Sequence, residues 1–171
     1  HISQNRNPQN NNFFFKNFPK SKIKKNNFLK IITRNKLLIN ECWRLTISKE
    51  LINKKNIRFE SIQIAEDASF IFKVLIKMSN IIINKNKFLF HRSRLNSLKY
   101  SIGIGPAFAY LYVLNEILKY KKTYFKEATV QKYLKFKMSY IISNINIYLN
   151  LLKSDEVSKL TKKFKNIYQK S

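Results

Sequence analysis

The pair Glu66-Asp67 is the first feature of this sequence whose residue types could do chemistry. Asp67 is one of only two aspartates in the chain, and it stands where a loop is expected to enter a helix. A carboxylate within hydrogen-bond reach of a hydroxyl group can take its proton and act as a general base. Both acids also suit a plain structural role, because negative charge stabilises the first turn of a helix. Position alone leaves both interpretations open.

The second such feature is the basic run that starts at His91 and contains Arg92 and Arg94. The two arginines are two residues apart, so in an extended chain they point to the same side. Two neighbouring guanidinium groups could clamp a diphosphate, and a solvated basic loop is the alternative in a chain this basic. His91 could bind phosphate or a metal, although a lone histidine after a strand is more often an ordinary packed or surface residue.

Other catalytic and metal-binding motifs are missing from the sequence. It has no HxxxH, CxxC or paired-aspartate motif, so we expect no complete metal site within this chain. It also has no P-loop, no GxGxxG and no G-x-S-x-G elbow. Cys42 is the only cysteine, which excludes an internal disulfide; we interpret it as a small buried apolar residue in a reducing compartment.

The formal net charge of +25 predicts attraction to anions such as nucleic acid, acidic lipid headgroups or phosphorylated substrates. Of the 34 basic residues only 6 are arginine, the residue that dedicated phosphate and nucleic-acid sites favour. Lysine, asparagine and isoleucine are also the residues that A+T-rich codons produce. We therefore interpret the charge as base-composition drift with a general attraction to anionic surfaces, and expect no specific nucleic-acid partner. A basic RNA-binding or ribosome-associated protein is the alternative.

The elements that must position these residues fall into three parts. Residues 1–27 are polar and broken by prolines, which indicates a loop. Residues 28–102 predict an α/β unit, and 103–171 a helical tail after the only two glycines. Within the α/β unit we expect a helix from 28 running into a strand near 38–45, a helix at 49–55 capped by Ser48, an extended segment at 57–64, an amphipathic helix at 66–78, and strands at 81–83 and 88–90.

The tail predicts three helices, over residues 107–120, 126–152 and 155–169. They interleave tyrosine and phenylalanine with lysine. We favour an ordinary helical subdomain packed on the α/β unit, and contact with a bilayer interface is the alternative. The sequence has no secretory signal and no uncharged apolar run of transmembrane length. We therefore expect a cytoplasmic protein, and a peripheral position on the inner face of the plasma membrane is a second hypothesis.

Five short runs in this order and spacing resemble family 2 glycosyltransferases, inverting GT-A enzymes that often build bacterial surface polysaccharides. The resemblance covers about residues 28–100, and no single run is specific by itself. The runs are Glu41-Cys42-Trp43-Arg44-Leu45, Ser48-Lys49-Glu50-Leu51, Asn56-Ile57-Arg58-Phe59, Ala65-Glu66-Asp67-Ala68-Ser69-Phe70 and His91-Arg92-Ser93-Arg94-Leu95-Asn96-Ser97-Leu98.

The resemblance implies a fold and a reaction. The fold would be α/β, the acceptor-side C-terminal half of a Rossmann-like GT-A domain followed by the helical tail. The reaction would move a sugar from a nucleotide-sugar donor to a saccharide or lipid-linked saccharide acceptor. Asp67 matches the general base, and Glu66 would position the acceptor or Asp67.

The basic loop matches the part of the family that covers the donor diphosphate. By this resemblance Arg92 and Arg94 would offset the charge on the leaving group, with His91 where the family often has an aromatic residue or histidine. By the resemblance Trp43 and Arg44 correspond to a strand beneath the acceptor site, but for Trp43 core packing is the role that we expect.

One departure from the family pattern changes the expectation for activity. Family members carry an N-terminal nucleotide-binding half with a D-x-D motif that holds Mg or Mn and the donor diphosphate. No aspartate precedes Asp67 here. We therefore expect a C-terminal fragment that is inactive alone, in which the full-length enzyme would need a divalent metal.

Overall fold

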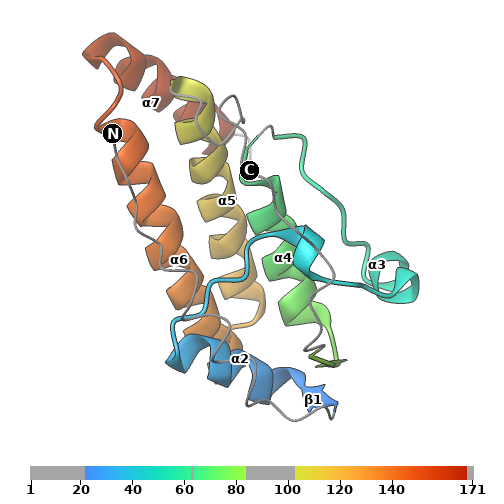
Figure 1. Cartoon of the computed structure of the whole chain (residues 1–171). Coiled ribbons are helices and arrows are strands. Elements are labelled where there is room, and N and C mark those ends of the chain that lie inside the picture. The colour runs from blue at the N-terminus through green and yellow to red at the C-terminus, as the bar shows by residue number, and fades with distance from the viewer. Residues whose placement is uncertain (1–21, 63, 84–102, 169–171) are drawn as a thin grey trace.

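The chain forms a mostly helical structure, seen in a computed structural model that describes residues 22–62, 64–83 and 103–168 (Figure 1). Six α-helices, one short 3-10 helix and one antiparallel strand pair make up these residues. The elements are β1 (Ile23–Lys24), α2 (Lys25–Arg34), η1 (Cys42–Arg44), α3 (Lys49–Lys54), α4 (Glu66–Lys77), β2 (Asn80–Ile81), α5 (Ile104–Thr123), α6 (Ala128–Leu149) and α7 (Ser154–Tyr168).

The predicted α/β fold, half of a Rossmann-like GT-A domain, is wrong. The structure is 68% helical and 3% strand, and its only described sheet has two strands of two residues each. That sheet pairs Ile23 with Ile81 and Lys24 with Asn80, so β1 and the start of α2 occupy residues that the sequence analysis assigned to a loop. The predicted strand at 88–90 lies outside the described residues.

The segment at 57–62 is β-prone in sequence but does not form a strand, because its side chains pack on α4 instead. Ile57 is buried, and the Phe59 ring stacks on Phe70 of α4 with centroids 4.0 Å apart. The Ile62 N–H turns back to the Glu60 carbonyl at 2.9 Å, which ends the extended course. The strand predicted near residues 38–45 is also absent: within these residues the structure has only the short helix η1.

Elements with strong local signals form close to where the sequence predicts them. Ser48 caps α3, since its Oγ accepts a hydrogen bond from the Leu51 N–H at 3.1 Å. The amphipathic helix predicted at 66–78 is α4, and the three tail helices are α5, α6 and α7. Gly103 has a φ of 131°, a backbone conformation that favours glycine, directly before α5.

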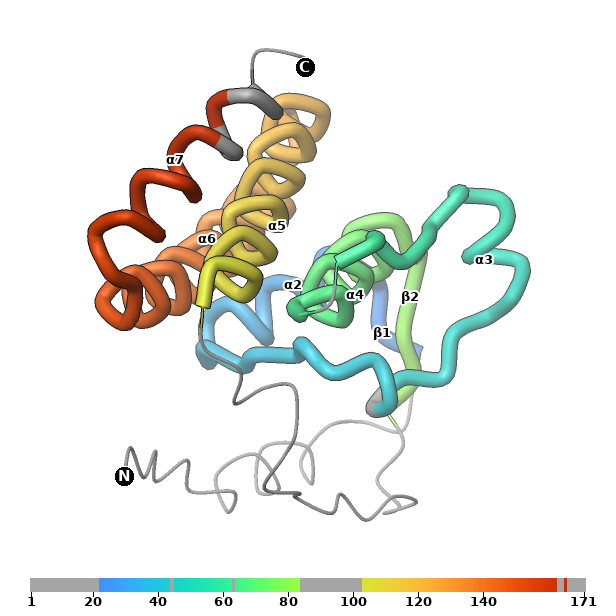
Figure 2. Tube along the Cα trace, turned by 90° about the horizontal axis from the view of Figure 1, so that it is seen from above, coloured from blue at the N-terminus to red at the C-terminus, as the bar shows by residue number. Residues whose placement is uncertain are grey.

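The helices form one packed body (Figures 1 and 2). In Figure 1, α5 and α6 run side by side in opposite directions, joined by residues 124–127, and α7 returns along the upper part of α5. α4 packs on α5, and α2 crosses the lower ends and contacts both α6 and α4. One buried core runs through this arrangement, with α4 at its centre.

A cluster of charged side chains fastens α4 to α5 and to the segment before α4. Lys73 of α4 is 6% exposed; its Nζ pairs with Glu60 and lies 3.5 Å from Oε2 of Glu116. The Tyr112 hydroxyl donates to Oε2 of Glu60 at 2.8 Å. Burial raises the pKa of Glu60, but the hydrogen bonds from Lys73 and Tyr112 outweigh it and hold that pKa below its usual value.

We predict that this cluster makes the fold sensitive to acid. The folded-state pKa of Glu60 is depressed, so its stabilising contribution is present above about pH 4.5 and is lost as the pH falls below that value. The wild type should therefore be more stable than Glu60→Gln at neutral pH, and this difference in unfolding free energy should become smaller as the pH is lowered to about 3. Urea denaturation across this range measures it.

Glu50→Gln is the matched control, because Glu50 is exposed on α3. Its difference from the wild type should stay small at every pH. If the difference in unfolding free energy between the wild type and Glu60→Gln does not change with pH, Glu60 is not the acid-sensitive group.

Candidate functional site

The candidate site lies where α4 begins. Ala65, the residue before the helix, adopts a left-handed conformation with φ of 63°, and Glu66 and Asp67 occupy the first turn. Oδ2 of Asp67 accepts a hydrogen bond from the backbone N–H of Cys42 at 3.4 Å. The η1 turn packs on α4, so two acids and a turn that lies 25 residues earlier come together.

The side chain of Cys42 is also turned toward this acidic pair. Burial, a hydrogen bond to Asp67 and the negative charge of Asp67 and Glu66 raise the pKa of the Cys42 thiol to about 11. A thiol is nucleophilic as its thiolate, so Cys42 is not a nucleophile near neutral pH. It is half-buried and unpaired with another cysteine in the described residues, which agrees with its interpretation as a packing residue. Its main contribution to the site is to hold the Asp67 carboxylate.

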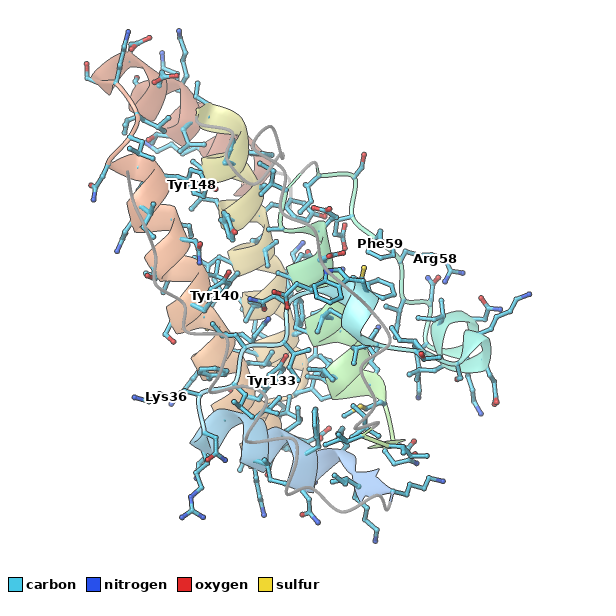
Figure 3. The ribbon with its side chains drawn as sticks, in the orientation of Figure 1. Lys36, Arg58, Phe59, Tyr133, Tyr140 and Tyr148 are labelled. Carbon is cyan, nitrogen blue, oxygen red and sulfur yellow. The ribbon has the colours of Figure 1, made fainter. Side chains whose placement is uncertain are left out.

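Trp43 follows Cys42 and is 40% exposed, so the core packing that we expected for it is wrong. Part of its side chain therefore lies at the surface, one residue from the N–H that binds Asp67. A second partly exposed aromatic ring, Phe59, stacks on Phe70, one turn along α4 from Asp67 (Figure 3). Aromatic faces next to a few polar groups are typical of sites that bind organic ligands.

The other predicted site residues are not located. The Arg44 side chain lies outside the described residues, and so do His91, Arg92 and Arg94. The structure thus brings together Glu66, Asp67 and the turn that carries Trp43, and leaves the predicted diphosphate clamp untested.

The part of the chain that the structure describes has no cluster of side chains that could bind a metal ion. No three histidine, cysteine, aspartate or glutamate side chains there lie close enough together to hold an ion. We therefore assign no step to a metal within these residues. Mg or Mn, expected for a full-length enzyme, would have to be bound by other groups.

The contact between Cys42 and Asp67 could not be found by sequence reasoning. It joins a backbone N–H to a side chain across 25 residues, and a backbone donor has no residue-type signal. The left-handed Ala65 was also missed, since alanine rarely adopts this conformation and nothing in its sequence position indicates it.

No protein-family model, no curated protein and no solved structure matches this chain.

We predict that Cys42 reacts slowly with iodoacetamide at pH of about 8, at least about tenfold more slowly than an unperturbed cysteine, because its thiolate fraction is so low. Asp67→Asn should speed the reaction, since it removes the negative charge beside the thiol. Mass spectrometry of the single labelled cysteine measures the rate. The exposed Asp155→Asn is the control and should leave the rate unchanged. Equal rates for Asp67→Asn and the wild type would show that Asp67 does not act on the thiol.

Proposed function

We propose that this chain supplies the acceptor side of a glycosyltransferase that moves a sugar from a nucleotide sugar to a saccharide or lipid-linked saccharide in surface polysaccharide synthesis. The observation that carries the proposal is the contact between Asp67 and the Cys42–Arg44 turn. It places a carboxylate at a helix start against the turn that presents a surface tryptophan. The resemblance of five ordered sequence runs to family 2 glycosyltransferases supports the same conclusion.

In the proposed reaction, Asp67 is the general base. Its carboxylate takes the proton of an acceptor hydroxyl as that oxygen forms a bond to the anomeric carbon, and the bond between that carbon and the nucleoside diphosphate breaks. The Cys42 N–H engages Oδ2, so a backbone group orients the carboxylate. A backbone donor keeps its place better than a flexible side chain does, which suits a base that needs a fixed position.

Glu66 and Trp43 would handle the acceptor. Glu66 lies next to the base in the same helical turn and can accept hydrogen bonds from sugar hydroxyls or position Asp67. Trp43 is 40% exposed, and a partly exposed aromatic side chain is the kind of group on which binding sites orient their ligands.

The nucleotide-binding D-x-D part of the donor side would come from groups outside this chain. Asp67 is the first aspartate of the sequence, so no D-x-D precedes it. We propose that the 171 residues alone do not turn over a nucleotide sugar, and that Arg92, Arg94 and His91 meet the donor diphosphate in the complete enzyme.

We predict that Asp67→Asn lowers the transfer rate of the complete enzyme about 10²- to 10⁴-fold, the range expected when a general base is lost. Transfer of labelled sugar from nucleotide-sugar donors to saccharide acceptors measures it. Asp155→Asn is the matched control, because Asp155 is the only other aspartate and pairs with Lys159 on an exposed helix start. Near-normal transfer by Asp67→Asn would refute the base assignment, and turnover by the isolated chain would refute the missing donor side.

Anionic membrane is the second partner that we propose, because a lipid-linked acceptor is presented at a bilayer. Apolar side chains stand exposed on and after α6, each at least 37% accessible: Ile142, Ile147, Leu151 and Val157. Exposed lysines lie on α6 and α7, among them Lys132, Lys135, Lys159 and Lys162. Apolar residues flanked by lysine suit contact with an anionic bilayer surface. None of the described helices is both long and apolar enough to cross a membrane.

We predict that the chain binds phosphatidylserine-containing vesicles in flotation experiments and is released by high salt. Replacing Ile142 and Ile147 by serine should weaken binding, whereas Ile82→Ser, at a 65% exposed position after β2, is the control and should not. Absence of salt-sensitive vesicle binding would remove the membrane partner. Salt-sensitive retention by single-stranded RNA in its place would favour the RNA-binding alternative.

A further inference from the structure

A lysine occupies an apolar position of α6. The buried residues of this helix are Val130, Tyr133, Leu134, Lys137, Ile141 and Ile145, which form one face at helical spacing. Lys137 is 1% exposed, so its whole side chain, including the ammonium group, lies inside the protein. Burying an ammonium is unfavourable unless hydrogen bonds and nearby charge compensate it. Its contacts therefore indicate what it does.

Those contacts are with the segment that leads to the candidate site. Nζ of Lys137 donates to the carbonyl oxygen of Ile39 at 3.5 Å and to Oδ1 of Asn40. In Figure 1 this segment leaves α2, which packs on α6, and runs to η1 beside α4. The next residues in sequence are Glu41 and Cys42. The segment is thus held at two points only a few residues apart, by Lys137 of α6 and by Asp67 of α4.

The charges around this ammonium leave it poorly compensated. Burial lowers the pKa of Lys137 to about 7, and the negative charge of Glu41, on the held segment, opposes that shift. Tyr133, one turn earlier on α6 and labelled in Figure 3, is fully buried with an unpaired hydroxyl. Burial raises the pKa of Tyr133, so it stays neutral. Glu41 is therefore the charged group whose field acts on Lys137.

We propose that Lys137 is a positioning residue for the candidate site. Its side chain fixes the segment at Ile39 and Asn40 and, through it, the Cys42 N–H that binds Asp67 and the next residue, Trp43. The catalytic meaning of this contact rests on the proposed function, but the contact itself does not. The acceptor side of the site is thus held by the helical tail, and the tail takes part in the reaction without touching the substrate.

Trp43 makes the proposal testable without any substrate, because it is the only tryptophan of the chain. Its emission and its quenching by acrylamide report on the segment that Lys137 holds. In the wild type, acrylamide quenching should increase as the pH is raised, with a midpoint near pH 7. At that point Lys137 loses its proton, and its charge-assisted hydrogen bonds to Ile39 and Asn40 weaken. In Lys137→Met this transition should be lost, and quenching should be high at every pH.

Two kinds of control separate this result from others. Histidine is the residue type that ordinarily titrates near neutral pH, and the chain has two, His1 and His91. The wild type is therefore compared with a variant in which both are glutamine, which should keep the transition. Asn40→Ala leaves Lys137 in place and removes one acceptor, so its quenching should rise at low pH while circular dichroism shows intact helices. This variant carries the test if Lys137→Met does not fold.

The outcomes are decisive in both directions. A transition that persists in Lys137→Met, or that disappears with the two histidines, overturns the proposal, and so does wild-type quenching in Asn40→Ala. If the fluorescence results hold but Asp67→Asn transfers sugar normally, the positioning contact stands and the proposed function fails. If Asp67→Asn is inactive but the quenching of Trp43 does not depend on Lys137, the proposed function stands and the positioning role fails.

Discussion

The burial of α4 on nearly every side is the constraint on which the rest of this structure depends. Nine consecutive residues of the helix, from Ala68 to Ile76, are buried, so other elements must cover it all round. α5, α2 and the segment before the helix provide that cover. Only its ends reach the surface, and the acids Glu66 and Asp67 stand at one of them. The position of the candidate site thus follows from the packing of the helix behind it.

Among the described residues two lysines are buried, and they compensate their charge in two different ways. Lys73 lies within ion-pair distance of two carboxylates, Glu60 and Glu116, and so links three segments around α4. Lys137 has neutral oxygen acceptors and only the field of Glu41, and burial lowers its pKa to about 7. The hydrogen bonds of Lys137 should therefore weaken within the neutral pH range, as the ammonium loses its proton. The chain has a net charge of +25. For a buried lysine, however, the groups around its ammonium determine its effect on stability more than this net charge does.

The sequence predicted the parts of the fold that depend on local signals. α4 and the tail helices follow from apolar spacing, and the start of α3 follows from the Ser48 cap. The sheet could not be predicted, because β2 pairs with β1 across more than fifty residues and the β-prone 57–62 segment satisfies its apolar side chains by packing on a helix. For the site, Asp67 and Glu66 could be named from position, but the Cys42 N–H that holds Asp67 could not. Lys137 did carry a signal, since it interrupts an otherwise apolar helical face.

The contacts that span the chain also set an order in which the molecule can assemble. The α5–α6 pair is local, with a four-residue connection at 124–127, and such contacts form early in folding. Lys25 with Glu127, at 3.0 Å, and Lys137 with Ile39 join residues separated by 102 and 98 positions, and closing loops of that length is slow. By this topology we expect the segment that carries Cys42 and Trp43 to reach its final position only once α6 has docked on α2. The candidate site is, by this topology, among the last regions of the protein to form and among the first to be lost when that docking opens.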